Sequence, residues 1–213
     1  METSKEKLLI AMSKGFQFEK LFGQKLSKVT EALDVSNLDV HVIQDDAQIA
    51  QRYFEKRGKE VSLIKAFSRP SLQRSLLAYN YVVVFWDGDD LTGLVHAATL
   101  LKLPVRLVPV QITKVRNRDR DQEFDVYIGR GTPWGNPFPI GKGGTGDSRE
   151  EVIEKYRKHF RENILTNPEM LKGMLGLKGA RLGCHCSPLP CHGDVIAGFL
   201  NTYEPDVPDE GDI

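Results

Sequence analysis

The stretch that decides the fold is YVVVFWDGDDLTG, residues 81–93 of the 213-residue chain. Its first six residues are apolar or aromatic, which is typical of a strand buried on both faces of a sheet. The aspartates and glycines that follow break the strand, and the apolar spacing of residues 92–101 then predicts a helix. A strand, a tight turn and a helix in this order form the repeating unit of parallel α/β proteins.

The same unit recurs on both sides of this stretch. Four further strands are predicted at 8–12, 38–43, 61–64 and 105–110, with helices at 16–33 and 45–56. Because apolar strands that alternate with helices pair in parallel, residues 1–110 are predicted to form a Rossmann-like parallel-sheet domain. Residues 111–203 are expected to form a smaller α/β C-terminal domain, and the acidic residues 204–213 a disordered tail.

The C-terminal domain has its own local signals. Ser148 and Glu151 have the spacing of a capping box, which predicts that a helix begins there. A short strand is predicted at 180–184, and a last helix from Val195. The charged run 116–121 contains no core residues and is expected to be a linker.

The charge balance limits the classes of partner that we expect. The chain has 29 basic and 29 acidic side chains, so its formal charge is zero, which argues against a nucleic-acid partner. No apolar run reaches the ~18 residues of a membrane span, and the first seven residues lack the apolar stretch of a signal peptide. We therefore expect a cytoplasmic protein without a membrane partner. The sequence indicates no particular oligomeric state.

The turn after the strongest strand is the first candidate site. In open α/β sheets, ligands bind beyond the carboxyl ends of the strands. Asp87, Gly88 and Thr92 lie at such an end, where aspartates suit ribose hydroxyls or Mg²⁺ better than a phosphate. The alternative is a solvated loop that caps the next helix.

The first half resembles a known superfamily. The strand, the Phe-Trp-Asp-Gly turn, the Thr-Gly pair, a His-containing helix and a terminal Pro-Val strand resemble the YspA-like branch of the SLOG superfamily over about residues 5–110. That superfamily groups DNA-processing A proteins with cytokinin-activating phosphoribohydrolases, and the resemblance implies binding of nucleotides or nucleotide-derived ligands at this turn. Residues 44–50, QDDAQIA, depart from the family's glycine-rich segment.

A second candidate site is YIGRGTPWGNPF at residues 127–138. Arg130 is suited to bidentate contacts with a phosphate or carboxylate. Trp134 is suited to stacking on a flat ring and Asn136 to reading its polar edge. The alternative is that Trp134 fills the core while Asn136 pins the turn.

All three cysteines fall in GCHCSPLPCHGD, residues 183–194, and an odd, clustered set is a poor disulfide framework. A zinc site would use Cys184, Cys186, Cys191 and His192. A catalytic site would use Cys191 as nucleophile with His192, and Asp194 as the orienting carboxylate or as the N-cap of the next helix. The third interpretation is that the cysteines only pack as small apolar residues.

The second half resembles another family. The motifs Arg-Gly-x-Pro-Trp-Gly-Asn-Pro-Phe, Ser-Arg-Glu-Glu-Val-Ile and Cys-x-Cys-x-Pro-x-x-Cys-His-Gly-Asp-Val resemble, over about residues 112–201, an uncharacterised domain common in phage and bacterial proteins. The resemblance implies a bacterial or phage-infected host cell. It also implies that the loop of Arg130, Arg149 and the Cys/His segment act together.

Together these patterns predict a phage-type protein that binds and processes a nucleotide or nucleoside-derived small molecule in its C-terminal domain. The reaction would be hydrolysis at the glycosidic or phosphate bond. One alternative is a binder of a nucleotide signal without turnover. Another is a zinc-stabilised interaction module, in which zinc would be the cofactor.

Overall fold

The computed structural model describes residues 5–68, 70–120, 123–141 and 146–204. The chain divides into two compact units, of which the first ends at Val110 and the second spans Gln111–Tyr203. The predicted tail lies, except for Glu204, outside the described residues. In the part of the chain that is described, no helix is long and apolar enough to cross a membrane.

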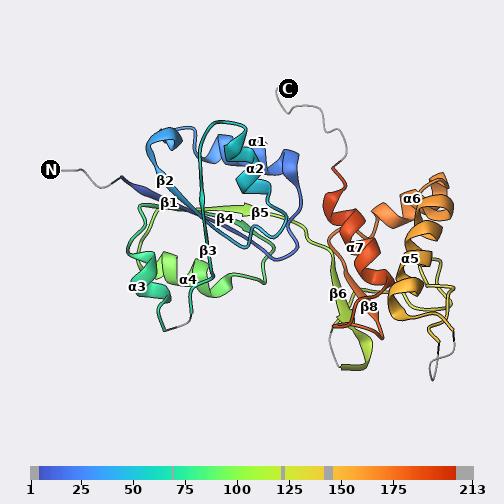
Figure 1. Ribbon diagram of the computed structural model, residues 1–213. Helices are drawn as coiled ribbons and strands as arrows, with labels where there is room; N and C mark the ends of the chain where they lie inside the picture. Colours follow the sequence, from blue (N-terminus) through green and yellow to red (C-terminus); the bar gives the residue numbers. More distant parts are fainter. Residues whose placement is uncertain (1–4, 69, 121–122, 142–145, 205–213) are drawn as a thin grey trace. The chain divides into compact units, whose positions relative to one another are not determined.

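The first unit is built on a five-stranded parallel sheet (Figure 1). Its strands, in spatial order, are β3 (Ser62–Ile64), β2 (Asp39–Ile43), β1 (Lys7–Met12), β4 (Tyr81–Trp86) and β5 (Val105–Pro109). The chain builds the sheet outward from β1 to β3 and then returns to the other side of β1. The point where the order reverses therefore lies between β1 and β4. The Rossmann-like prediction is confirmed.

Helices cover both faces of this sheet (Figure 1). Two of them, α1 (Glu19–Val29) and α2 (Ile49–Glu55), lie on one face, and α3 (Leu72–Leu76) and α4 (Thr92–Leu100) lie on the other. A 3₁₀ turn at Val35–Asn37 precedes β2. Double coverage explains why β1 and β4 are apolar along their length, since side chains on both faces are buried.

Alternate residues of the central strands build two cores. Leu9 and Ala11 face α3 and α4 together with Val82 and Val84. On the opposite face the ring of Phe22 in α1 stacks on Phe85 of β4, with ring centroids 4.9 Å apart. Both phenylalanines are completely buried.

The second unit is a small parallel sheet with helices packed on it. Its strands are β6 (Lys114–Asn117), β8 (Arg181–Cys184) and β7 (Val126–Tyr127), with β8 in the centre. Helix α7 (His192–Thr202) contacts β6 and β8 and also α5 (Arg149–His159). The remaining elements are a 3₁₀ turn at Arg118–Arg120, a π-helical turn at Phe160–Ile164 that continues α5, and α6 (Pro168–Leu175).

The structure corrects two local predictions and confirms a third. The run predicted as a linker begins inside β6, because Arg116 pairs with Gly183 in the small sheet. The last helix begins at His192 rather than at Val195, since Cys191 caps it. The capping box of Ser148 is present, with the Ser148 hydroxyl accepting from the Glu151 N–H at 3.2 Å.

We expect Phe22→Ala to lower the free energy of unfolding by about 3–5 kcal/mol, because it removes a buried ring and leaves a cavity against Phe85. Urea unfolding measures the change. The control is Leu63→Ala, which truncates a side chain that is 53% exposed and should cost less than about 1 kcal/mol. Equal losses in the two variants would contradict this account of the core.

Candidate functional site

The turn after β4 is held by its own carboxylates. Oδ1 of Asp87 accepts hydrogen bonds from the Ser13 hydroxyl at 3.1 Å and from the backbone N–H groups of Asp89 and Asp90 at 3.1 and 3.0 Å. Asp90 in turn accepts from the N–H of Lys14 at 2.7 Å. The carboxylates therefore accept hydrogen bonds from backbone N–H groups at the point where the strand order reverses. Ligands bind at this point in open sheets.

The start of α2 is occupied in the same way. The Asp45 carboxylate accepts from the N–H groups of Ile49, Ala50 and Gln51 at 2.6, 3.2 and 2.9 Å. Because a carboxylate already neutralises these donors, a phosphate would meet repulsion rather than free amides here. This matches the absence of the family's glycine-rich segment from residues 44–50.

The other predicted residues of this turn have modest roles within the described structure. Gly88 adopts a φ of +88° that lets the turn close, and the Thr92 hydroxyl donates to the Asp89 carbonyl at 2.6 Å. Nearby, Gln44 Oε1 and Trp86 Nε1 are buried without a hydrogen-bond partner among the described residues. An acceptor and a donor of this kind suit a neutral polar group better than an anion.

In the second unit, the carboxyl edge of the small sheet brings together the ends of three strands, of which β8 is far from the other two in the sequence. Strand β6 ends at Asn117, β7 at Tyr127 and β8 at Cys184, and all three strands run in the same direction. Ligands favour this edge of a parallel sheet. The loop of Arg130 follows β7, and the Cys184–Cys191 loop follows β8.

The loop of Arg130 is folded tightly on itself. The Gly129 carbonyl accepts from the Thr132 hydroxyl at 2.9 Å and from the Thr132 N–H at 3.2 Å. A Cβ on Gly135 would lie 2.6 Å from the Gly129 oxygen and 3.0 Å from Arg130 Cα, so only glycine fits there. Arg130 itself is exposed, and its guanidinium has no hydrogen-bond or ion-pair partner in the described part of the chain.

Trp134 and Asn136 support this loop. The Trp134 ring packs against the hydrophobic core of the second unit and lies close to Gly173 of α6, where an added Cβ would be 3.2 Å from the ring. The Tyr156 hydroxyl donates to the Trp134 carbonyl at 2.8 Å, and Asn136 Oδ1 accepts from the Phe138 N–H at 2.9 Å. These contacts correspond to the packing and turn-pinning alternative.

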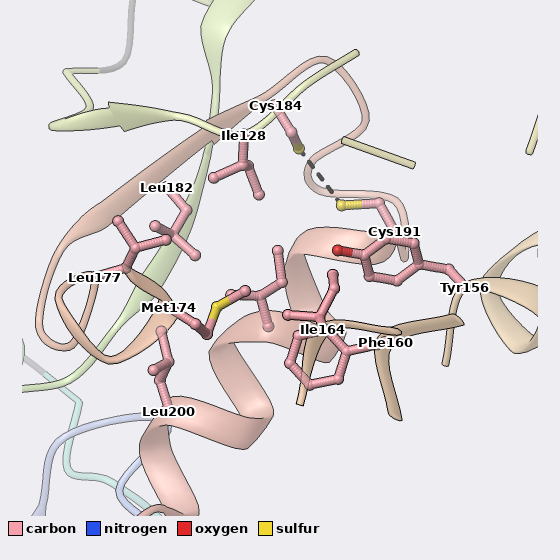
Figure 2. Packing of buried hydrophobic residues seen from close by; sticks show 11 residues of the cluster. Ile128, Tyr156, Phe160, Ile164, Met174, Leu177, Leu182, Cys184, Cys191 and Leu200 are labelled. Carbon is pink, nitrogen blue, oxygen red and sulfur yellow. Dashed lines mark hydrogen bonds between the residues drawn. The ribbon is translucent and has the colours of Figure 1, made fainter. Parts of the chain in front are cut away.

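Two of the three thiols form a buried pair. Cys184 Sγ and Cys191 Sγ lie 3.4 Å apart within the hydrophobic core of the second unit, and the two residues are 1% and 3% exposed (Figure 2). Cys191 is the N-cap of α7, and its sulfur accepts from the Gly193 N–H at 3.3 Å. The Asp194 carboxylate completes a capping box by accepting from the Cys191 N–H at 2.7 Å. The predicted N-cap role of Asp194 is therefore wrong, because Asp194 is the third helical residue.

The paired thiols share one proton unequally. The Cys191 thiol and the backbone N–H groups of Ser187 and Cys186 donate to the Cys184 sulfur, and they lower the pKa of Cys184 to about 6. The same interaction with Cys184, together with burial, raises the pKa of Cys191. The sequence pointed to Cys191 as the activated thiol, whereas the contacts favour the thiolate on Cys184.

His192 is a structural link between α7 and β7. Its Nε2 donates to the Ile128 carbonyl at 2.8 Å, and its ring meets the Tyr156 ring edge-on with centroids 5.3 Å apart. Burial lowers the pKa of His192, so the imidazole is neutral with its proton on Nε2. His192 Nε2 is therefore already used in the hydrogen bond to Ile128, and the Asp194 carboxylate accepts from the Cys191 N–H.

The four predicted zinc ligands are not assembled into a site. Among the residues that the structure describes, no group of three His, Cys, Asp or Glu side chains is placed to hold a metal ion. Cys184 and Cys191 are turned toward each other and His192 toward Ile128. The donor set therefore does not fit a tetrahedral zinc centre.

Arg149 joins the cysteine segment. Arg149, the first residue of α5, donates from Nη1 to the Pro190 carbonyl at 3.2 Å. This places a guanidinium directly beside the residue that precedes Cys191.

Sequence reasoning missed a further group at the same edge. His185 connects Tyr127 and Asp119 by a hydrogen bond on each ring nitrogen, at 3.0 and 2.7 Å. Two of these residues lie inside motifs that were recognised, but their partners are 58 and 66 positions away. No local pattern signals such a pairing.

With this geometry described, the comparisons with known proteins place the chain in a family. The model of the minimal SLOG domain matches residues 5–116, more than half of the chain, and the chain belongs to this family. SLOG domains commonly bind nucleotide-related ligands. Residues 110–202 match a domain of unknown function, DUF4326. Both resemblances drawn from the sequence are confirmed.

Individual proteins are also similar to the chain, among them a phage protein and a bacterial epimerase. An uncharacterized 12.4 kDa protein in the nrdA-td intergenic region of Enterobacteria phage T4 is 46% identical over 79 residues, which are 37% of this chain and 69% of the phage protein. A crystal structure of a nucleoside-diphosphate-sugar epimerase from Pseudomonas aeruginosa aligns with a TM-score of 0.29 and 14% identity. That alignment covers 74% of this chain and 49% of the epimerase.

We expect the thiol pair to make stability depend on pH. The folded pKa of Cys184 is about 6, below its ordinary value of 9.0, so between these values the folded protein binds fewer protons than the unfolded chain. The free energy of unfolding should therefore rise from pH 6 to pH 9. Above that range the raised pKa of Cys191 makes the contribution fall again.

Urea unfolding in reducing buffer across this pH range measures the effect in wild type, Cys184→Ala and Cys186→Ala. The first variant should lose the part of the slope that the pair contributes. The second, which alters the thiol outside the pair, should keep it. An unchanged slope in Cys184→Ala would show that Cys184 stays protonated.

We expect His192→Ala to lower the free energy of unfolding by about 1–3 kcal/mol, because the buried Ile128 carbonyl loses its donor. His96→Ala is the control, since His96 is exposed on α4 and should change stability by less than about 0.5 kcal/mol. If the two variants unfold alike, His192 is not the structural link described above.

Proposed function

We propose that this protein binds a nucleotide-derived anion at the carboxyl edge of its small sheet. The observation that carries the proposal is the guanidinium of Arg130, which is exposed and has no partner among the described residues, although the loop beneath it is fixed by close packing. Preorganisation of the loop reduces the ordering cost that binding of a ligand has to offset.

The position of Arg130 supports a phosphate ligand. A guanidinium presents its donors in a planar fork that matches the oxygens of a phosphate. Membership of the SLOG family supports a nucleotide-related ligand. In the first unit, by contrast, carboxylates occupy the amides where a phosphate would bind, so the anion is proposed to bind in the second unit.

Arg149 is proposed as the second cation of the site. One of its nitrogens donates to Pro190, which leaves the other guanidinium nitrogens for a ligand beside the cysteine loop. Trp134 and Asn136 then act by shaping the loop, as their contacts with Gly173, Tyr156 and Phe138 indicate.

The Cys/His segment is proposed to be the framework of the site rather than its nucleophile. The Cys184 sulfur, which carries the lower pKa, is 1% exposed, and His192 uses Nε2 to hold Ile128. A buried thiolate cannot reach a ligand at the edge without a rearrangement. The packing of the thiols instead fixes the start of α7, where His192 bonds to Ile128, two residues before Arg130.

The test is isothermal titration calorimetry with two nucleotides, AMP and thymidine 5′-monophosphate, each compared with its nucleoside. We expect the nucleotides to bind more tightly than the nucleosides. Arg130→Ala should weaken nucleotide binding about tenfold or more, because a charge-assisted hydrogen bond contributes about 1.5–3 kcal/mol. Nucleoside binding should change little.

Arg161→Ala is the matched control, since Arg161 is exposed on the π-helical turn after α5 and pairs weakly with Glu154 at 3.9 Å. It should bind like wild type. The proposal is wrong if neither nucleotide binds, or if Arg130→Ala binds both as tightly as the control does.

A further inference from the structure

Tyr127, His185 and Asp119 form a hydrogen-bonded chain at the carboxyl edge of the small sheet. His185 Nδ1 lies 2.7 Å from Asp119 Oδ2, and His185 Nε2 lies 3.0 Å from the Tyr127 hydroxyl. A carboxylate only accepts, so Nδ1 donates to Asp119, and the lone pair of Nε2 then accepts the phenol proton. A hydroxyl, a base and a carboxylate that orients the base are the parts of an activated nucleophile.

One buried amide positions two members of this chain. Asn117, at the end of β6, is 6% exposed. Its Oδ1 accepts from the Asp119 N–H at 2.8 Å, and its Nδ2 donates to the His185 carbonyl at 3.4 Å and to the Ser187 carbonyl. The same side chain therefore fixes the backbone of both the carboxylate and the histidine. Groups that are held in this way by a second layer of hydrogen bonds are preorganised for a site.

The phenol is held toward His185 by glycine packing. A Cβ on Gly129 would overlap the Tyr127 hydroxyl and ring, so the ring lies directly across Gly129. The Tyr127 and His185 rings meet edge-on, with centroids 5.7 Å apart at 80°. The Arg118 guanidinium lies over the Tyr127 ring at 4.8 Å from its centroid, where a cation stabilises a phenolate.

Stability does not account for this arrangement. The side chains of His185 and Asp119 are 49% and 60% exposed, and exposed pairs of this kind contribute little to folding. Because these two side chains are exposed, a ligand can reach the hydrogen-bonded group of Tyr127, His185 and Asp119. They also lie at the ends of β6, β7 and β8, the same edge to which the loop of Arg130 belongs.

We infer that Tyr127 is a catalytic nucleophile for a nucleotide phosphate ester, with His185 as its general base and Asp119 and Asn117 as positioning residues. The choice of a nucleotide rests on the proposed function. The choice of a phosphorus centre rests on two guanidinium groups: that of Arg118, which lies over the Tyr127 ring, and that of Arg130, which follows Gly129 directly in the sequence.

The step balances within these groups. The Tyr127 oxygen forms a bond to phosphorus while its proton passes to His185 Nε2. The bond from phosphorus to the leaving oxygen breaks, and that oxygen takes the proton from the imidazolium. Water then attacks the phosphotyrosyl ester and gives one proton to His185, the bond from phosphorus to the Tyr127 oxygen breaks, and the imidazolium returns that proton to the phenolate.

The experiment has two probes. A fluorophosphonate reports the nucleophile without any nucleotide, since the phenol oxygen displaces fluoride from phosphorus. The p-nitrophenyl ester of thymidine 5′-monophosphate reports the nucleotide reaction through release of p-nitrophenolate and a thymidylyl adduct. Peptide mass spectrometry of the full-length protein locates both adducts.

Tyr81 is the internal control, because its hydroxyl donates to the Glu6 carboxylate at 3.3 Å rather than to a histidine. We expect the fluorophosphonate to label Tyr127 about tenfold or more faster than Tyr81. His185→Gln and Asp119→Asn should each bring the Tyr127 rate toward that of Tyr81, with folding checked by circular dichroism. Labelling of Tyr127 no faster than Tyr81, or unchanged in folded His185→Gln, overturns the inference.

The two proposals fail separately. If AMP and thymidine 5′-monophosphate bind in calorimetry but Tyr127 is not labelled, the nucleophile is wrong and the binding proposal stands. If Tyr127 is labelled by the fluorophosphonate but neither nucleotide binds, the nucleophile stands and the nucleotide assignment fails. A thymidylyl adduct on Tyr127 supports both.

Discussion

The parallel pairing of β8 with both β6 and β7 is the constraint on which the candidate site depends. Parallel strands cannot be joined by a tight hairpin, so their ends come from distant parts of the chain and are followed by different loops. Gly183 makes the pairing compact, because the Phe124 ring lies where a Cβ would be. The pairing brings Asp119, Tyr127 and His185 to one edge, although His185 is 58 and 66 positions from the other two.

The charged groups at the strand ends differ between the two units. In the first unit the turn amides and the start of α2 are satisfied by Asp45, Asp87 and Asp90, so the protein supplies the negative charge itself. In the second unit the charges at the sheet edge include exposed guanidinium groups, those of Arg118 and Arg130. The zero net charge of the chain therefore describes neither unit well. A ligand responds to the local charge at the strand ends, and this charge differs between the two units.

The sequence was sufficient for features whose cause is local. The apolar run of β4 and the Ser148 capping box act over a few residues, and the structure has both. The sequence was insufficient for β6. Its lysine and arginine are typical of a solvated linker, although the strand ends at Asn117, whose side chain is buried. The role of Asp194 was missed because a cysteine is an uncommon N-cap. The contacts of His185 depend on pairing between distant strands, for which periodicity carries no information.

Gly129 and Tyr127 also bear on how this protein can diverge. The ring of one residue occupies the space where the other would carry a side chain. Tyr127 can be replaced by a smaller residue, but a larger residue at Gly129 has room only if the tyrosine ring has already been lost. The order of substitution is therefore constrained: Tyr127 has to change before Gly129 can. The two positions should consequently vary together among relatives.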